Sequence, residues 1–231
     1  NFVPKSATLC NVLTQTEVDP KDPAFQHPTK PVGPVYTKEE AEALAAKEGW
    51  SIAPDNDKFR RVVPSPEPKR IFGLKSLKTL VEAGHIVICC GGGGIPVMRH
   101  GNHLKGASAV IDKDFASELL AESLDADALI ILTAVEKVAI NFGKHDQQWL
   151  SDLTPELARQ YIAEGQFAPG SMLPKVQAEI GENSLMKQGT WAYLGSSNDA
   201  ANRYLFWTSV NTDAVGAGQN IPVIIQTGDG R

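Results

Sequence analysis

The second half of the chain alternates between helix-like and strand-like patterns of apolar residues. Apolar side chains recur every three or four residues, as on one face of a helix, in 74–84, 114–124, 155–164 and a stretch beginning near Leu173. Runs rich in β-branched and apolar residues lie between these segments and predict strands at 85–90, 105–111 and 127–135. This alternation predicts an α/β fold, in which helices cover the faces of a mainly parallel sheet.

The first part of the chain has a different texture. Residues 13–36 are dense in proline and polar side chains, which favours ordered loops or edge strands because proline lacks a backbone donor. A helix is expected in 37–49, where Thr37 and Glu40 can form a capping box and Gly49 can end the helix.

Composition limits the classes of protein to which the chain can belong. With 231 residues, 42% of them hydrophobic, the chain can bury the core of one large domain. A net charge of −5 argues against binding nucleic acid or an anionic lipid surface, and the apolar runs are far too short to span a bilayer. Three cysteines, of which Cys89 and Cys90 are adjacent, form no disulfide framework, and no charged-then-apolar leader opens the chain. We therefore expect a protein of the reducing cytoplasm whose partners include neither nucleic acid nor membrane.

Four successive glycines, 91–94, directly follow the strand expected at 85–90. Open α/β sheets bind ligands where their strands end, and glycines there let backbone N–H groups approach an anion closely. The sequence "CCGGGGIPV" is neither a Walker loop nor a dinucleotide fingerprint, because no Gly-Lys-Ser/Thr follows and Pro96 interrupts the pattern. An anion site and a simple tight turn both remain open.

A lysine between two aspartates, Asp112-Lys113-Asp114, stands where the strand expected at 105–111 runs into the helix expected at 114–124. A helix N-terminus attracts anions through its free N–H groups and its dipole. Lys113 could therefore hold a phosphate, while the aspartates orient it or help to hold a metal. The alternative is that Asp114 caps the helix beside a solvated lysine.

Two further candidates rest on single residue types. Lys175 ends "FAPGSMLPK", where a turn delivers it to the start of another helix, a position again suited to phosphate, although surface lysines are common. His100 and His103 lie in a polar loop without further ligands at metal-site spacing, so we expect no protein metal site.

Seven stretches, in order along the chain, resemble carbamate kinase, a branch of the amino acid kinase family. They lie between Val12 and Ile180 and read "TQTEVDPKDPAF", "PTKPVGP", "RRVVPSPEP", "CGGGGIPV", "GNHLKGASAVIDKDFASE", "DADALIILTAVEKVAINFGK" and "GQFAPGSMLPK". The resemblance implies a three-layer α/β/α sandwich and reversible phosphoryl transfer between ATP and carbamate. Carbamate is already an anionic nucleophile, so such catalysis needs positioning and cations rather than a general base.

The resemblance also implies roles for particular residues. Lys113 and Lys175 would hold the transferring phosphoryl group and the nucleotide phosphates, with Asp114 orienting them. Lys30 would reach toward the acceptor from a protruding subdomain. The glycines that would approach the substrate anion are Gly91, Gly92, Gly93 and Gly94. The nucleotide pocket would be lined by Thr133, Ala134, Val135, Lys137, Val138, Met172 and Lys175. Mg²⁺ would accompany ATP or ADP, the other substrate would be carbamate or carbamoyl phosphate, and the family implies a homodimer.

Four regions are expected on this basis. They are an N-terminal remnant (1–12), a protruding subdomain with its connector (13–70), a nucleotide-binding α/β lobe (71–180) and an unmatched tail (181–231). The family's N-terminal part, which carries a Gly-Gly-Asn phosphate loop and a second glycine-rich loop, is not matched, so we expect a fold that is incomplete at its N-terminus.

Three hypotheses for function follow. The chain is a carbamate kinase, or a large piece of one. Alternatively, it is a module that binds ATP or ADP without transferring a phosphoryl group. The third hypothesis is a kinase of the same superfamily that uses another carboxylate or phosphonate acceptor.

Overall fold

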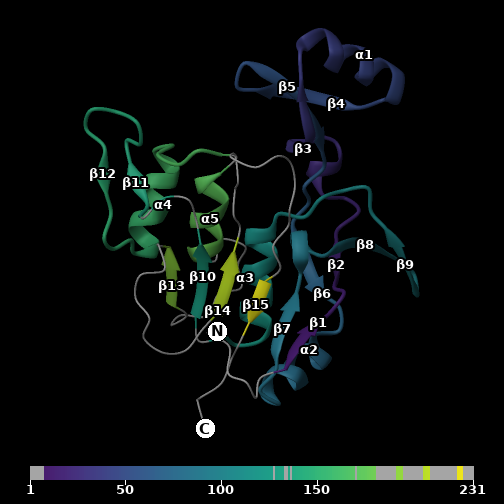
Figure 1. Ribbon diagram of the computed structural model, residues 1–231, viewed down its shortest axis with the longest axis vertical. Helices are drawn as coiled ribbons and strands as arrows, with labels where there is room; N and C mark the ends of the chain where they lie inside the picture. Colours follow the sequence, from purple (N-terminus) through teal and green to yellow (C-terminus); the bar gives the residue numbers. More distant parts are fainter. Residues whose placement is uncertain are drawn as a thin grey trace.

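The computed structural model describes residues 8–126, 128–132, 135, 137–169 and 171–180, together with the strands 191–194, 205–208 and 223–225. Figure 1 shows a lobe built around a six-stranded sheet, and a smaller unit of strands and one helix that protrudes from this lobe.

The six-stranded sheet is mixed but mainly parallel. In order across the sheet, its strands are β1 (Leu9–Asn11), β7 (Ile86–Cys89), β15 (Val223–Ile225), β14 (Leu205–Thr208), β10 (Ala128–Leu132) and β13 (Trp191–Leu194). Neighbouring strands run parallel except at β15, which is antiparallel to both β7 and β14. The expectation of an α/β fold with a mainly parallel sheet is confirmed.

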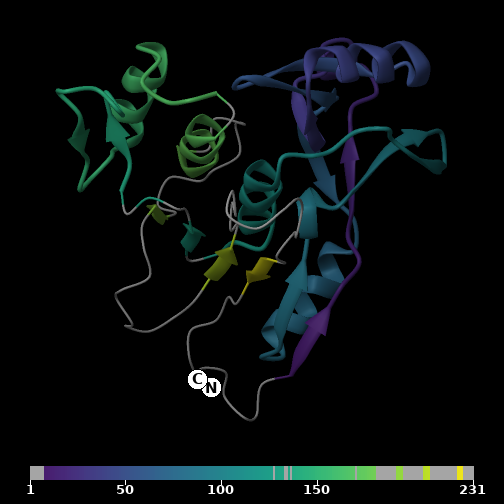
Figure 2. The ribbon, with the colours of Figure 1, turned by 45° about the horizontal axis from the view of Figure 1, so that its top comes forward.

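Helices cover this sheet where the apolar spacing predicts them. α2 (Leu74–Glu82) packs against β7, whereas α3 (Lys113–Ser123) packs against β10 and against α5 (Met172–Ile180). α4 (Pro155–Ala163) lies against α5, next to a short hairpin made by β11 (Ala139–Ile140) and β12 (Gln148–Trp149). Figure 2 shows α3 and α5 side by side above the strands of the sheet.

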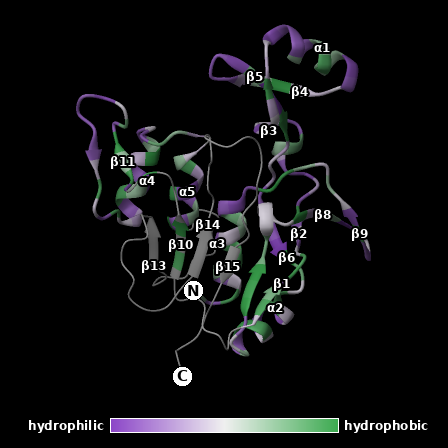
Figure 3. Cartoon of the chain, in the orientation of Figure 1, coloured by the Kyte–Doolittle hydropathy of each residue, from purple (hydrophilic) through white to green (hydrophobic). Residues whose placement is uncertain are grey.

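The main core lies between this sheet and its helices. Leu77 of α2, Leu120 of α3 and Ile131 of β10 are fully buried in one apolar cluster, which also contains Cys89 and Cys90. The two adjacent cysteines are therefore core residues. Figure 3 shows the same contrast along the chain, with apolar residues on β7 and β10 and hydrophilic residues over much of α1.

A four-stranded sheet connects the lobe to the protruding unit. Its order is β6 (Pro68–Ile71), β2 (Gln15–Val18), β8 (Ile95–His100) and β9 (His103–Gly106). β2 precedes the protruding unit in the chain and β6 follows it, and these two strands pair antiparallel. The segments that enter and leave the unit therefore start from neighbouring strands.

The protruding unit itself spans residues 30–63. Its strands are ordered β3 (Lys30–Tyr36), β5 (Lys58–Val63) and β4 (Ser51–Asp55), with α1 (Lys38–Glu48) packed on them. The expected capping box of α1 is confirmed, because Thr37 Oγ1 accepts from Glu40 N at 3.3 Å and Glu40 Oε2 accepts from Thr37 N at 2.9 Å. Gly49 ends the helix in the left-handed conformation, with a φ of 69°.

The strand expected at 105–111 is wrong. Lys105 and Gly106 end β9, and the segment 107–112 then runs irregularly to the start of α3. Its backbone donors go to other partners: Ala107 N donates to Pro96 O, and Val110 N donates to Pro64 O, both at 2.9 Å. The apolar composition of this segment reflects packing, since Ile111 is buried with Val18 and Ala116.

Among the described helices, none combines the length and the apolar character that crossing a membrane requires.

Candidate functional site

The first turn of α3 is fixed by the side chain of Asp112. Asp112 Oδ1 accepts from the backbone N–H of Asp114 at 2.8 Å, which makes Asp112 the N-cap, and Ser117 Oγ donates to Lys113 O at 2.7 Å. The alternative in which Asp114 caps the helix beside a solvated lysine is therefore wrong. A cap at position 112 leaves the Asp114 side chain available for a different partner.

That partner is Lys175. Its Nζ donates to Asp114 Oδ2 at 2.9 Å, and the two side chains are 12% and 3% exposed, respectively. Because α5 packs against α3, residues 61 positions apart in sequence meet in a nearly dry contact. The structure thus places Lys175 at the same turn as Lys113.

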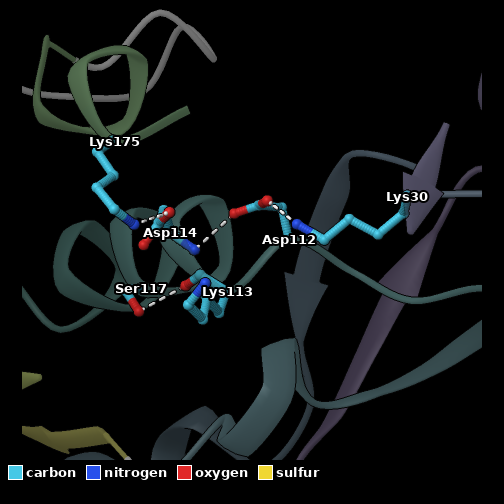
Figure 4. Close-up of polar contacts among 6 residues, drawn as sticks. All are labelled: Lys30, Asp112, Lys113, Asp114, Ser117 and Lys175. Carbon is cyan, nitrogen blue, oxygen red and sulfur yellow. Dashed lines mark hydrogen bonds and ion pairs between the residues drawn. The ribbon is translucent and has the colours of Figure 1, made fainter. Parts of the chain in front are cut away.

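Lys30 reaches this turn from the protruding unit. It is the first residue of β3, and its Nζ donates to Asp112 Oδ2 at 2.5 Å, with side-chain exposures of 28% for Lys30 and 10% for Asp112. Figure 4 shows Lys30 and Lys175 approaching the start of α3 from opposite sides, with Asp112 and Asp114 between them.

The charges around this turn influence one another. Burial is the largest factor that lowers the pKa of Lys113, and the positive charges of Lys175 and Lys30 lower it further, while Asp114 and Asp112 partly oppose the change. The pKa of Asp112 is lowered overall: burial acts to raise it, but the charge and hydrogen bond of Lys30 and the N–H of Asp114 outweigh burial. Three ammonium groups and two carboxylates therefore share one small region.

A third carboxyl group, that of Glu179 on α5, lies near enough to Asp114 to feel its charge. Glu179 is 8% exposed, and neither of its oxygens has a hydrogen-bond partner among the described residues. Burial raises the pKa of Glu179 well above its usual value, and the negative charges of Asp114 and Glu118 add to this, with Lys175 opposing. Glu179 and Glu118 each stand four residues after a member of the Lys175–Asp114 pair, and thus one turn along the same interface.

The glycine segment packs against the loop that leads to α3. Gly93 has a φ of 92°, and a Cβ there would lie 2.5 Å from the carbonyl oxygen of Ile111. At Gly94 a Cβ would lie 2.4 Å from Thr16 Oγ1, the hydroxyl that donates to Gly93 O at 3.0 Å. These two glycines are required by packing and by a positive φ. A Cβ at Gly91 meets open space, so a ligand has room to approach the backbone at this glycine.

The residues expected at the nucleotide pocket have different surroundings. Val138 and Met172 pack in an apolar cluster with Val176 and Phe167, whereas Lys137 is exposed. Val135 lies among the described residues, but Thr133 and Ala134 lie outside them. This part of the expected site stays a prediction.

In the described region, the cluster of Lys30, Lys113 and Lys175 coincides neither with a group of metal ligands nor with the cavity near β6 and α3. Within this region, no three His, Cys, Asp or Glu side chains are grouped so as to hold a metal ion. A cavity of about 130 Å³ lies between β6 and α3, lined by Glu67, Pro68, Lys69, Phe115, Glu118, Leu119 and Glu122. The candidate site is thus defined by its ion pairs rather than by this cavity.

Sequence reasoning missed two contributions to the site. It did not foresee that Asp112 binds Lys30, whereas the contact of Asp114 with Lys175 agrees with the orienting role that the resemblance implied for Asp114. It gave no role to Thr14, whose Oγ1 accepts from Cys90 N at 2.9 Å and so anchors the glycine segment. The available signal was the alternation of hydroxyls in "LTQT", the stretch that leads into β2.

Comparison with known proteins shows what the chain as a whole is similar to. The chain matches the model of the amino acid kinase family over residues 36–180. It is 58% identical over 171 residues to the carbamate kinase-like protein YqeA of Escherichia coli K12, a match that covers 74% of this chain and 55% of that protein. It is 54% identical over 200 residues to a carbamate kinase of Haemophilus influenzae, covering 86% of this chain and 63% of that protein. The chain therefore spans little more than half the length of these relatives.

The chain is also similar to solved structures of a carbamate kinase. Carbamate kinase from Giardia lamblia bound to AMP-PNP superposes with a TM-score of 0.71 at 42% identity, covering 82% of this chain and 60% of that chain. The same enzyme bound to citric acid gives a TM-score of 0.74 at 41% identity, with coverages of 82% and 59%.

Proposed function

Because the chain belongs to the amino acid kinase family, we propose that the protein transfers a phosphoryl group between ATP and carbamate, chiefly making ATP from ADP and carbamoyl phosphate. The observation that carries this proposal is the convergence of Lys30, Lys113 and Lys175 on the first turn of α3. The names of the similar proteins, which are carbamate kinases or carbamate kinase-like, support the choice of acceptor.

The proposed reaction needs no proton transfer by the protein. A terminal phosphate oxygen of ADP attacks the phosphorus of carbamoyl phosphate, the bond from that phosphorus to the carbamate oxygen breaks, and carbamate leaves as an anion. The obstacle is the mutual repulsion of several negative charges. An ammonium group about 4 Å from a phosphate oxygen contributes roughly 4 kcal/mol at an effective dielectric constant of 20, which is why a cluster of lysines suits this chemistry.

Each lysine has a position suited to part of this task. Lys113 and Lys175 would hold the transferring phosphoryl group and the nucleotide phosphates, and Asp114 would keep Lys175 in place. Lys30, on the protruding unit, would contact the acceptor side. The dipole of α3, whose N-terminus lies at this turn, would add to the same positive field.

The remaining ligand contacts belong to the glycine segment and to the loop after β10. Gly91 has room for a ligand next to its backbone, so the substrate anion would approach the segment there rather than at Gly93 or Gly94, which are closely packed. Val135 and Lys137 would line the nucleotide pocket together with the neighbouring positions 133 and 134. Binding of the adenine and ribose by this loop is part of the proposal.

We propose that Mg²⁺ enters with the nucleotide. The described residues offer no group of three metal-ligating side chains, so the ion would be held mainly through phosphate oxygens and water, as is common for Mg²⁺. When bound, the ion supplies charge neutralisation at the phosphates. The ammonium groups of Lys30, Lys113 and Lys175 would neutralise phosphate charge in the same way.

A cytoplasmic homodimer completes the proposal. The reducing character expected from three unpaired cysteines supports the compartment, and light scattering on a size-exclusion column tests the assembly. A mass of one chain at micromolar concentration would contradict the dimer.

Two measurements together test the proposed reaction. The first is titration calorimetry with Mg-ADP, and the second is a coupled assay of ATP formation from Mg-ADP and carbamoyl phosphate. Binding with turnover supports the proposal, whereas binding without turnover indicates a nucleotide-binding module. Turnover with another acyl phosphate or a phosphonate, and none with carbamoyl phosphate, indicates a kinase with a different acceptor.

A further inference from the structure

Two contacts join the base of the protruding unit to segment 107–112. One is a backbone hydrogen bond from Val110 N to Pro64 O at 2.9 Å, just after the last strand of the unit. The other is the ion pair between Lys30 and Asp112 at 2.5 Å, at the first residue of the unit. Lys30 and Val63 are cross-strand partners, so both contacts act at the same end of the unit.

Both oxygens of the Asp112 carboxylate are used. Oδ1 accepts from Asp114 N, and Oδ2 accepts from Lys30 Nζ (Figure 4). A carboxylate held in this way has one orientation, and its side chain is 10% exposed, so water screens the contact only partly. Asp112 therefore ties the position of the protruding unit to the first turn of α3.

Asp112 offsets a repulsion that Lys30 meets at this turn. The positive charge of Lys30 lowers the pKa of Lys113, so these two ammonium groups repel each other. Lys30 is the most exposed member of the two ion pairs, at 28%, and it is carried by a unit that extends away from the lobe (Figure 1). Repulsion would favour movement of Lys30 and its unit toward solvent.

We propose that Asp112 is a positioning residue, which docks the protruding unit on the lobe and so keeps the ammonium group of Lys30 in the phosphate site. The proposal rests on the proposed function for the identity of the ligand. The docking itself rests only on contacts within the chain, those of Lys30 with Asp112 and of Pro64 with Val110. Asp112 acts through Lys30 and need not touch the substrate.

The substitution Asp112→Asn separates docking from helix capping. Asparagine caps helices as well as aspartate does, so the bond to Asp114 N and the stability of α3 should be kept. The charge that balances Lys30 is lost. Asp112→Ala loses both, and we expect its melting temperature to fall by a further 2–4 °C or so. Asp55→Asn is the matched control, because Asp55 pairs with Arg60 at 3.0 Å inside the protruding unit rather than at its base.

The first readout is the distance between two spin labels. Ala46→Cys on α1 and Glu82→Cys on α2 provide exposed labelling sites in the two parts, with Cys10→Ser removing the native thiol that is not buried. In Asp112→Asn the distribution of label distances should broaden and shift, and in Asp55→Asn it should match the unsubstituted chain. An unchanged distribution in Asp112→Asn would overturn the proposal.

The second readout is the affinity for inorganic phosphate, measured by calorimetry. We expect Asp112→Asn to weaken phosphate binding about tenfold, since one charge-assisted contact is misplaced. Lys30→Gln should weaken it by a similar factor, and the double variant should be no weaker than either single variant. Unchanged or tighter binding in Asp112→Asn would overturn the proposal, because it would mean that Asp112 merely competes with the anion.

The two readouts also distinguish the two proposals. If the unsubstituted chain binds neither phosphate nor Mg-ADP, the proposed function fails, while the label distances still decide whether Asp112 docks the unit. If phosphate binds normally and the labels do not move in Asp112→Asn, the positioning role fails and the proposed function stands.

Discussion

Lys175 and Asp114 meet across the interface of two helices, with 2.9 Å between Lys175 Nζ and Asp114 Oδ2. The two residues are 61 positions apart, and each comes from the first half of its helix. This contact brings the only cation of α5 to the turn of α3 that carries Lys113. The contact thus places two ammonium groups at one end of α3.

Replacing Asp114 by asparagine should damage both stability and affinity for phosphate. The variant leaves the charge of Lys175 buried without its counter-charge, beside a second lysine, which should cost about 2–4 kcal/mol in the free energy of unfolding. Chemical denaturation followed by circular dichroism measures this change. Asp55→Asn, which breaks an ion pair in the protruding unit, is the control and should cost much less. Equal losses in the two variants would contradict a special role for the buried pair.

Lys113 should react with amine reagents at lower pH than exposed lysines do. Burial and the charge of Lys175 lower the pKa of Lys113, so at pH 8 a larger fraction of its amine is uncharged. Pyridoxal phosphate carries an aldehyde and a phosphate, and after borohydride reduction it should mark Lys113 before the exposed Lys78. Peptide mass spectrometry reads the labelling, and Mg-ADP should protect Lys113. Uniform labelling of both lysines, with no protection, would count against a phosphate site.

The buried carboxyl group of Glu179 should make the fold less stable as pH rises. Its folded-state pKa is raised well above the usual value, so between pH 4.5 and that raised pKa the folded chain keeps a proton that the unfolded chain releases. The contribution of Glu179 to stability is therefore full below pH 4.5 and falls as pH rises through this window.

Glu179→Gln should remove this dependence. The variant should melt at a higher temperature than the unsubstituted chain at pH 8, and at a similar temperature near pH 4.5. Scanning calorimetry from pH 4.5 to 8 measures the effect, with the exposed Glu164→Gln as the matched control. Parallel curves for Glu179→Gln and the unsubstituted chain would mean that Glu179 is ionised and solvated.

Two substitutions in the glycine segment should separate packing from ligand binding. Gly93→Ala places a Cβ 2.5 Å from Ile111 O at a φ of 92°, so it should lower the free energy of unfolding by about 2 kcal/mol or more. Gly91→Ala meets open space and should fold normally, yet weaken phosphate binding if this backbone faces the anion. Thermal melting and phosphate titration of both variants test this assignment. Normal melting of Gly93→Ala would contradict it.

The spacing of apolar residues along the chain was sufficient to predict many of the helices and strands. The helices at 74–84, 114–124 and 155–164 and the strand at 85–90 follow from apolar spacing, because one face of each element is buried. The strand expected at 105–111 failed because its apolar residues pack while its backbone bonds to segments distant in sequence, at Pro64 and Pro96. The pattern of apolar residues cannot distinguish a strand from an irregular segment whose apolar side chains are buried.

The site was harder to predict in detail than the fold. Lys113 could be singled out because a charged triplet at a helix start has a local meaning, whereas the partners of Asp112 and Asp114 are set by long-range packing. The same is true of Glu179: its burial depends on how α5 lies on α3, which no local spacing reveals. Family resemblance supplied Lys30, but not the aspartate that holds it.

The rate of ATP formation by the Lys113→Ala variant tests the central claim most directly. Lys78→Ala, which removes an exposed lysine of α2, is the control, and both variants should melt near the unsubstituted chain. If the lysines around α3 neutralise the phosphoryl group in the transition state, Lys113→Ala should slow catalysis. The rate of ATP formation from Mg-ADP and carbamoyl phosphate should fall about 10²- to 10³-fold. A rate equal to that of Lys78→Ala would contradict the claim.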